Sequence, residues 1–444
     1  MIGSNTLPPP KLAPSAAPRR RCPLSPTGVP GGRHDLPLRQ RRILRAVAAT
    51  APPVAAPGRG GSPRLTIPGG AFQRRCPGAP QPPYCVQERS HRHAEPTAPH
   101  TGRAGSPERT IRKGRGVTAG LALALAVAAL LGAAAHRGGL CTVRAVAEVL
   151  TTRRGHILWS FLKASFWTTS LLALAAAAGH AAPLARFSFD WIAVAGGLLF
   201  GIGAAMNGAC ALSTFARLAE GHVAMAFAPL GWLAGMAALA HAAPAAQPPD
   251  QAAALPGWLA LPALVWIGAE GLRLARRLRR DGLGPGGAAA WPLSLAVLVM
   301  AAAYAALLLA GAPWSFTSTA LCTAQAGAST TCGATGLLWL LSGAAVAGMA
   351  GSAALRGSFR LRRPRPRAAL RHLAAGATMG AGAALIPGGN DGLILFGLPS
   401  LSPHALPAWL AIVGGILLTL AAMRRAGARL PGVSCEADVC RAVP

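Results

Sequence analysis

Charged residues are scarce in this chain, and acidic ones are the scarcest. Asp, Glu, Lys and Arg make up 13% of the 444 residues, and only 13 residues are Asp or Glu. Soluble domains usually carry about a quarter charged residues. Hydrophobic residues, in contrast, account for 52% of the chain. This composition excludes an ordinary soluble globular protein and indicates a chain that lies within a lipid bilayer.

The sequence also lacks the short patterns that hold metals, nucleotides and haem. Its nine cysteines show no Cys-x-x-Cys or Cys/His spacing of a zinc site. No Gly-rich loop followed by Lys is present to bind phosphate, and histidines in the apolar stretches do not pair at i, i+4 spacing. We therefore expect no metal, no bound cofactor and no enzymatic activity, and we expect no disulfide framework.

The N-terminal segment, residues 1–116, is rich in Pro, Arg, Gly, Ser and Ala and shows no sustained apolar period. Such a segment cannot bury enough apolar surface to offset the entropy lost on ordering, so it is predicted to be disordered. Its basic character would suit a nucleic-acid-binding arm, which is a rival interpretation for this segment. Because the rest of the chain is apolar, we expect lipid and no nucleic acid as partner of the whole protein.

From Thr118 onward, apolar stretches long enough to cross about 30 Å of hydrocarbon follow one another. A Gly/Pro-rich break at residues 282–287 interrupts them. The sequence predicts an all-α polytopic membrane protein with a first transmembrane repeat over 117–281, a second over 282–430 and a tail over 431–444. About nine spans are predicted, at residues 118–135, 156–179, 190–215, 222–243, 257–273, 291–311, 333–355, 369–388 and 404–423.

Arginine clusters predict how these spans are oriented. They follow alternate spans, as at residues 273–280 and 356–371, while the intervening loops carry little positive charge. Positive loops stay in the cytoplasm, so the C-terminus is predicted to be cytoplasmic and the first span to begin outside. A basic segment over residues 1–116 would then have to be exported. Because the charge rule disfavours this, we expect translation to begin near Val117.

Two similarities relate the halves of the apolar region. Residues 138–145 (Gly-Gly-Leu-Cys-Thr-Val-Arg-Ala) resemble residues 319–326 (Thr-Ala-Leu-Cys-Thr-Ala-Gln-Ala). Residues 201–206 (Gly-Ile-Gly-Ala-Ala-Met) resemble residues 380–385 (Gly-Ala-Gly-Ala-Ala-Leu) at nearly the same offset. The repeat is displaced by an odd number of spans, so the two halves are predicted to be inverted. Inverted repeats are common in transporters, whose solute site lies near the midplane between the halves.

Both repeats carry helix-breaking residues directly after these glycine runs. Broken helices expose backbone N–H groups, and half-helix N-termini attract anions. The glycines have an alternative explanation, which is that small residues let helices pack closely. The two explanations do not exclude each other. The break residues predicted to lie along the solute path are Asn207, Gly208, Gly388, Gly389 and Asn390.

Three cysteines are predicted to share that path. Cys141 and Cys322 occupy equivalent positions in the two repeats, and Cys210 lies at the first break. A thiol is a weak hydrogen-bond donor, so it would hold a polarisable sulfur-containing anion and still release it. The alternative is that each cysteine is a small buried hydrophobe. Cys332 has no counterpart in the other half and is assigned to that alternative.

Charged residues inside spans are costly and need explanation. Lys163 would attract an anion, pair with a carboxylate, or mark an error in the span boundary. Glu220 and Glu270 lie near span ends and are interpreted as structural. Asp391, at the second break, is predicted to cap the helix that begins at Leu393.

Residues 117–430 resemble the YeeE/YedE sulfur-transport family. The chain departs from the family where Gly-Gly-Cys is common, since it reads Gly208-Ala209-Cys210, and where Phe is common before the first cysteine, at Leu140. The segments that carry the resemblance are Arg137-Gly-Gly-Leu-Cys141, Gly201–Cys210, Arg217-Leu-Ala-Glu-Gly221, Cys322, and Pro387-Gly-Gly-Asn-Asp-Gly with Gly397-Leu-Pro399.

The resemblance implies a bacterial inner-membrane transporter in which Cys322, Cys210 and Cys141 line an hourglass-shaped path. The implied solute is thiosulfate or a related sulfur or selenium species, moved inward by facilitated transport or an ion gradient. The rival function is a membrane thiol oxidoreductase or sulfurtransferase that uses the same thiols for covalent chemistry. That rival would need a reactive thiol pair, a haem or a quinone site.

The resemblance also bears on the C-terminal residues, which carry Cys435 and Cys440 in a short polar stretch. The family often works with a small TusA-like sulfur-carrier protein. The resemblance therefore implies that these cysteines hand sulfur to such a partner. The alternative is a disordered cytoplasmic tail with idle cysteines.

Overall fold

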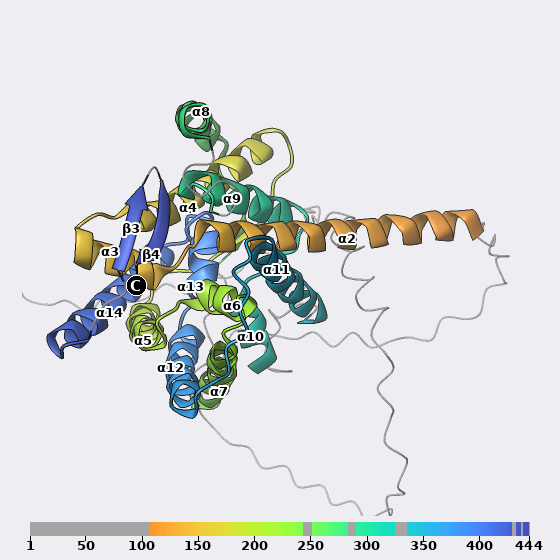
Figure 1. The fold of residues 1–444 in the computed structure, drawn as a ribbon. Coiled ribbons are helices and arrows are strands. Elements are labelled where there is room, and N and C mark those ends of the chain that lie inside the picture. The colour runs from red at the N-terminus through yellow and green to blue at the C-terminus, as the bar shows by residue number, and fades with distance from the viewer. Residues whose placement is uncertain are drawn as a thin grey trace, which may run out of the picture.

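Stretches rich in Ala, Leu and Gly form the helices of this protein, because a backbone in hydrocarbon must satisfy its own hydrogen bonds. The computed structural model describes residues 107–242, 251–282, 290–324, 335–428, 432–436 and 438–443. The long helices are α2 (Pro107–Gly138), α4 (His156–Ala177), α5 (Trp191–Asn207), α7 (Phe227–Ala242), α8 (Ala260–Asp281), α9 (Leu293–Leu309), α11 (Thr335–Leu355), α12 (Pro366–Ala384) and α14 (Ala405–Arg425) (Figure 1).

Shorter elements connect these helices. Two antiparallel strand pairs join β1 (Leu184–Arg186) to β2 (Gln251–Ala253) and β3 (Gly432–Glu436) to β4 (Val439–Val443). The short helices are α3 (Thr142–Thr152), α6 (Ala211–Ala219), α10 (Phe316–Ala324), α13 (Gly389–Gly392), a π-helix (Leu393–Gly397) and two 3-10 turns (Val223–Ala226 and Gly257–Leu259).

Every predicted apolar range contains a helix, so the all-α polytopic fold is confirmed. In the described part of the chain, 6 helices or helix pairs are long and apolar enough to cross a membrane. Helices α7 and α9 are apolar but shorter, and α12 begins in a basic stretch. The six spans are Ala119–Thr152, His156–Ala177, Trp191–Ala219, Gly257–Asp281, Thr335–Leu355 and Ala405–Arg425.

Helix packing supports the predicted relation between the halves. The sequence repeat makes α2, α4, α5 and α7 the counterparts of α9, α11, α12 and α14. Helix α7 packs along α12, and α14 packs in the equivalent way along α5. Likewise α11 contacts α2, and α4 contacts α9. The counterparts α5 and α12 contact each other, as do α2 and α9, which is the pattern that a two-fold relation produces.

Glycines bring these helix pairs into close contact. A Cβ atom at Gly382 of α12 would overlap backbone atoms of Phe200 and Gly196 in α5. A Cβ at Gly380 would overlap the backbone of Trp232 in α7. Small residues let helix backbones approach in this way in membranes. The packing explanation for the glycine runs therefore holds alongside the helix breaks that follow them.

Both predicted helix breaks are present. Helix α5 ends at Asn207, the next residue, Gly208, has a left-handed φ of 73°, and α6 begins after Cys210. Helix α12 ends at Ala384, and Gly388 and Gly389, at the start of α13, have φ angles of 84° and 60°. Such angles favour glycine, because a Cβ is strained there. The short helices α6, α10 and α13 contact one another near the centre of the bundle (Figure 1).

The C-terminal segment is not a disordered tail. Strands β3 and β4 form a hairpin in which Cys435 lies opposite Cys440, and the two are joined by a disulfide. The alternative of a disordered tail was therefore wrong, and these two cysteines are paired although no disulfide framework was expected. A short polar segment has no local pattern that predicts a strand. Here it is ordered by contacts with helices that are distant in the sequence. Figure 1 shows the hairpin beside α3.

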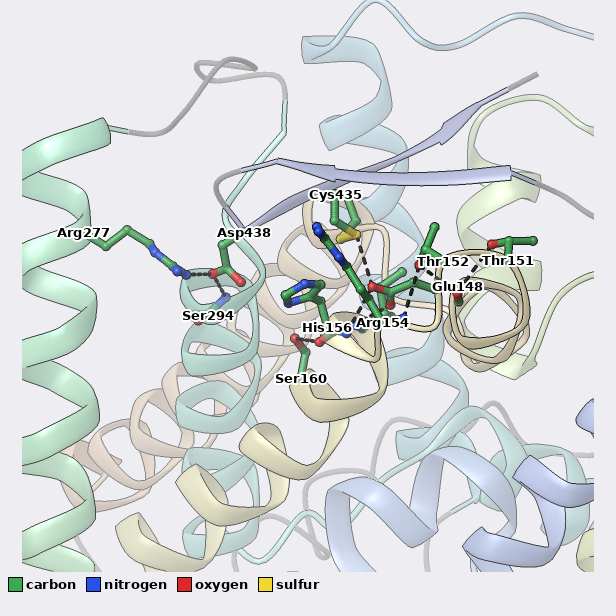
Figure 2. The surroundings of a disulfide bond; sticks show 12 residues. Glu148, Thr151, Thr152, Arg154, His156, Ser160, Arg277, Ser294, Cys435 and Asp438 are labelled. Carbon is green, nitrogen blue, oxygen red and sulfur yellow. Dashed lines mark hydrogen bonds and ion pairs between the residues drawn. A yellow bond between two sulfur atoms is a disulfide. The ribbon is translucent and has the colours of Figure 1, made fainter.

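Asp438 in the hairpin turn anchors the segment to helix α9. Its backbone oxygen accepts a hydrogen bond from the Leu293 N–H at 2.7 Å, and its carboxylate accepts one from the Ser294 N–H at 2.9 Å. Arg277 of α8 pairs with the same carboxylate at 2.8 Å (Figure 2). A carboxylate at a helix N-terminus satisfies N–H groups that lack partners within the helix.

The start of α2 differs from the predicted boundary. The helix begins at Pro107, inside the segment predicted to be disordered. The remainder of that segment, residues 1–106, lies outside the described residues, as does Cys332.

Candidate functional site

A cavity of about 310 Å³ opens where the end of α2, the start of α3 and helix α6 meet. The hairpin contributes Cys440 to its wall. Positive charge dominates, since four arginines and one carboxylate line it. The lining residues that matter for charge and chemistry are Arg137, Arg144, Arg217, Arg356, Glu220, Cys141, Ser213 and Cys440.

The arginines are held in different ways. Arg137 donates a hydrogen bond to the Ser352 hydroxyl at 3.1 Å and lies 5.7 Å from the centre of the Trp291 ring. No carboxylate of the described residues lies within ion-pair distance of Arg144 or Arg217. Arginine charges without a carboxylate partner attract an anion, because the partly enclosed wall weakens solvent screening.

The one lining carboxylate, Glu220, is held by a histidine. His136 Nε2 lies 3.2 Å from its Oε1, while His136 Nδ1 lies 2.9 Å from the Ser352 hydroxyl. Burial raises the pKa of the Glu220 carboxyl, but the His136 hydrogen bond and nearby positive charge outweigh it and lower the pKa overall. Glu220 is thus structural, as the sequence predicts, and leaves the cavity attractive to anions.

The thiol of Cys141 forms the inner end of the cavity. Helix α2 ends at Gly138, Gly139 turns the chain with a φ of 60°, and Cys141 becomes the N-cap of α3. Cys210 is likewise the N-cap of α6. Both cysteines are unpaired, and each is only 1% exposed. Two helix N-termini therefore carry a buried thiol each, and a helix N-terminus is a favourable place for a bound anion.

Ser213 connects these two thiols. Its hydroxyl donates a hydrogen bond to the Cys141 sulfur at 3.0 Å and lies 3.4 Å from the Cys210 sulfur. Ser213 is not among the site residues predicted from the sequence, although its spacing from Cys210, three residues later in the first turn of a helix, places both on one face.

The sequence model of the sulphur transport family matches residues 137–418. The chain belongs to the sulphur transport family. The resemblance identified from the sequence is thereby confirmed, and the match begins at Arg137, in the wall of the cavity. No protein among those with curated descriptions matches the chain.

In this sulphur transport protein the residues of the first helix break, Asn207 and Gly208, contact other parts of the protein near the thiols. The Asn207 amide donates to the Ala209 carbonyl at 3.0 Å and to the Thr214 hydroxyl at 2.9 Å. Its oxygen lies 2.7 Å from His372 Nδ1 of α12. Asn207 is therefore occupied by protein partners. A Cβ at Gly208 would lie 3.9 Å from the Arg217 guanidinium, so this glycine borders the arginine cluster.

The second break of the transport protein is built differently. The Asp391 carboxylate accepts hydrogen bonds from the Phe316 N–H at 2.8 Å, the Thr317 N–H at 3.3 Å and the Thr317 hydroxyl. It therefore caps α10 and not the helix beginning at Leu393, so that prediction was wrong. The reason is tertiary, because α10 comes from a distant part of the chain.

Glycine and asparagine complete this second break. A Cβ at Gly389 would overlap the Thr317 side chain, whereas Gly388 has room around it. Asn390 is buried, and its side-chain oxygen has no hydrogen-bond partner in the described part of the chain. An unpartnered buried acceptor is unusual in a folded protein.

Cys322 does not join the other two predicted cysteines at the cavity. It lies in the last turn of α10 and is disulfide-bonded. An aromatic cluster lies between α6 and α10, with the rings of Phe215 and Phe316 stacked at 4.1 Å. The fold thus brings Cys141 and Cys210 together through Ser213, whereas Cys322 lies in α10, which this stack joins to α6.

The remaining charged candidates are structural in the transport protein. Lys163 pairs with Glu270 and donates to the Ser294 hydroxyl at 3.2 Å. Arg273 also reaches Glu270, at 3.4 Å. Lys163 therefore pairs with a carboxylate and attaches α8 to α4, and the interpretation of Glu270 as structural is confirmed. Within the described residues no group of His, Cys, Asp and Glu could hold a metal ion.

Proposed function

We propose that this sulphur transport protein imports thiosulfate or a related sulfur-containing oxoanion across a bacterial inner membrane. One observation carries the proposal: the buried Cys141 thiol and Ser213 line a cavity rich in arginines, and the Ser213 hydroxyl also contacts the buried Cys210 thiol. Such a site combines positive charge for an oxoanion with polarisable sulfur for its sulfur atom. The family match supplies sulfur transport as the general function.

The arginines attract the anion and fix its orientation. Arg144 and Arg217 have no ion-pair partner in the described chain, so their N–H groups are available to anionic oxygens. Hydrogen bonds to charged groups contribute about 1.5–3 kcal/mol each. The terminal sulfur of the anion would then lie toward Cys141. Because arginine-rich loops are cytoplasmic in this topology, we assign the cavity to the cytoplasmic side.

The two thiols and Ser213 bind the passing solute weakly. Thiols are weak donors, so they hold a sulfur atom without the strong bonds that would prevent release. The N-termini of α3 and α6 add favourable dipoles at the same place. We assign the Phe215–Phe316 stack, which joins α6 to α10, as the barrier that closes the path.

The second break supplies the matching half of the path. Gly388 has room around it there, and Asn390, whose buried side-chain oxygen has no partner in the described part of the chain, follows two residues later. Reduction of the Cys322 disulfide would restore the third thiol of the predicted path.

The experiment measures uptake of radiolabelled thiosulfate by a sulfur-auxotrophic bacterium that lacks its own uptake systems. The host carries the full chain, its Cys210→Ala variant, or Thr419→Ala as a control with a hydroxyl bonded only within α14. Uptake with the full chain and the control, but not with Cys210→Ala at equal membrane expression, supports the proposal. If the full chain takes up no thiosulfate although it reaches the membrane, the proposed solute is wrong. If Cys210→Ala transports normally, import stands and the cysteine relay is wrong.

A further inference from the structure

The disulfide of the C-terminal hairpin lies at the arginine-lined cavity. Cys440 is part of the cavity wall, in the same hollow as Cys141. The hairpin is fixed in place by Asp438, which binds the N-terminus of α9 and Arg277 of α8. Both sulfur atoms therefore have defined surroundings, and those surroundings differ.

We propose that Cys435 and Cys440 form a redox-active pair that takes the terminal sulfur from an oxoanion such as thiosulfate held in the cavity. Cys440 is the attacking thiol, and Cys435 resolves the product by forming the disulfide. This inference rests on the proposed function, because the transported anion is the substrate. It adds covalent sulfur transfer to import.

The position of Cys440 suits an attacking thiol. It shares the cavity with Arg137, Arg144, Arg217 and Arg356. Neighbouring cations favour the thiolate form of a cysteine, which is the nucleophile. The same cations would hold the sulfonate oxygens of thiosulfate, so that its terminal sulfur lies near the cysteines in the wall.

The position of Cys435 suits a resolving thiol. Its sulfur lies 3.6 Å from the Glu148 Oε1 (Figure 2). Glu148 is buried and also accepts hydrogen bonds from the backbone N–H groups of His156 and Ile157, at 3.1 and 3.0 Å. A carboxylate beside a thiol favours the protonated thiol, so Cys435 attacks only when Glu148 accepts its proton. Cys440 thus faces cations and Cys435 faces a carboxylate. This difference makes Cys440 the attacking thiol and Cys435 the resolving thiol.

A purely structural role explains the disulfide less well. The two cysteines are separated by only 5 positions, and a disulfide that closes a short loop restricts the unfolded chain less than one that closes a long loop. The hairpin is already anchored by Asp438. The arginine distribution places it in the cytoplasm, where disulfides are usually transient and take part in redox chemistry.

The reaction balances in two steps. The Cys440 thiolate attacks the terminal sulfur of thiosulfate, a new S–S bond forms, and sulfite leaves with the electron pair of the broken S–S bond. Cys440 then carries a persulfide. Cys435 gives its proton to Glu148 and attacks the Cys440 sulfur, forming the disulfide. The outer sulfur of the persulfide leaves with the electron pair of the bond that breaks and takes the proton from Glu148, so that it departs as hydrosulfide. Two thiols are oxidised as one sulfur atom is reduced, and a cellular dithiol reductant restores the pair.

The test uses the purified full-length protein, reduced and then freed of reductant under anaerobic conditions. Thiosulfate is added, and sulfite, sulfide and the mass of the C-terminal peptide are measured. We expect the unaltered protein to release sulfite and sulfide in equal amounts. Cys435→Ser is expected to release sulfite but no sulfide and to gain one sulfur atom on Cys440. Cys440→Ser is expected to release neither, whereas Cys22→Ser, a matched control in the N-terminal segment, behaves like the unaltered protein.

Two outcomes overturn the proposal. In the first, Cys440→Ser releases as much sulfite as the unaltered protein. In the second, Cys435→Ser carries no added sulfur on Cys440. Thiosulfate uptake by the same variants is measured separately. Uptake without sulfite release leaves the proposed import standing and rejects the sulfur transfer, whereas sulfite release without uptake rejects import alone.

Discussion

Cys141 and Cys210 lie at the N-caps of two different helices, yet one hydroxyl, that of Ser213, contacts both sulfurs at 3.0 and 3.4 Å. Each cysteine is held by backbone geometry, since the residue two positions before it is a glycine with a left-handed φ. Each glycine turn thus places a cysteine at the N-terminus of the helix that follows. The proposed sulfur site thus depends on two glycine turns and the Ser213 side chain.

Removal of the shared hydroxyl is the first test of this arrangement. Ser213→Ala deletes one hydrogen bond to the Cys141 sulfur without changing charge or fold. A typical hydrogen bond contributes about 1 kcal/mol, so we expect about a five-fold loss of thiosulfate uptake at low substrate concentration. Thr419→Ala is the control, and uptake by it should match the unaltered protein. Equal uptake by Ser213→Ala would remove this hydroxyl from the path.

Arg217 should contribute to affinity for the anion. Arg217→Gln removes one positive charge from the cavity, and we expect the KM for thiosulfate uptake to rise about ten-fold, because hydrogen bonds to charged groups contribute about 1.5–3 kcal/mol. Arg217→Lys should restore part of the affinity. Arg276→Gln, on the exposed side of α8, removes the same charge elsewhere and should leave KM unchanged. A similar rise in both Gln variants would indicate a general effect of net charge.

Close helix packing at Gly382 predicts a loss of stability on substitution. The Cβ of Gly382→Ala would overlap the backbone of α5, and overpacking of this kind typically costs about 1–3 kcal/mol. Gly414→Ala is the matched control, because no atom lies within 4 Å of its Cβ position in α14. Alanine also favours a helix over glycine. Thermal unfolding in detergent should therefore occur at lower temperature for Gly382→Ala only. A melting temperature of Gly382→Ala at or above that of the unaltered protein contradicts this account.

The lowered pKa of Glu220 predicts a dependence of stability on pH. The carboxylate form is favoured in the folded protein by His136 and nearby positive charge, so its contribution is present above the unfolded pKa of about 4.3 and is lost as the pH falls through the lower folded pKa. Melting temperatures measured between neutral and acidic pH should fall less steeply for Glu220→Gln than for the unaltered protein. Glu436→Gln, exposed on the hairpin, serves as the control. Identical pH profiles for Glu220→Gln and the unaltered protein would contradict the prediction.

The sequence by itself determined the membrane class, the helical ranges, both helix breaks and the family. These features depend on local composition, because a span requires a long apolar run and a break requires residues such as Gly208 and Gly388 that tolerate a left-handed φ. The related segments around Cys141 and Cys322 also indicated two similar halves.

Only the tertiary structure decided which residues meet. Cys141 and Cys210 are brought together while Cys322 is held in a disulfide, Asp391 caps α10 and not its own helix, and Lys163 pairs with Glu270. Cys435 and Cys440 form an ordered pair because Asp438 satisfies the N-terminus of α9. Each of these depends on contacts between segments far apart in the chain. Local propensity carries no information about such contacts, because they are set by helix packing and by the need to pair buried polar groups.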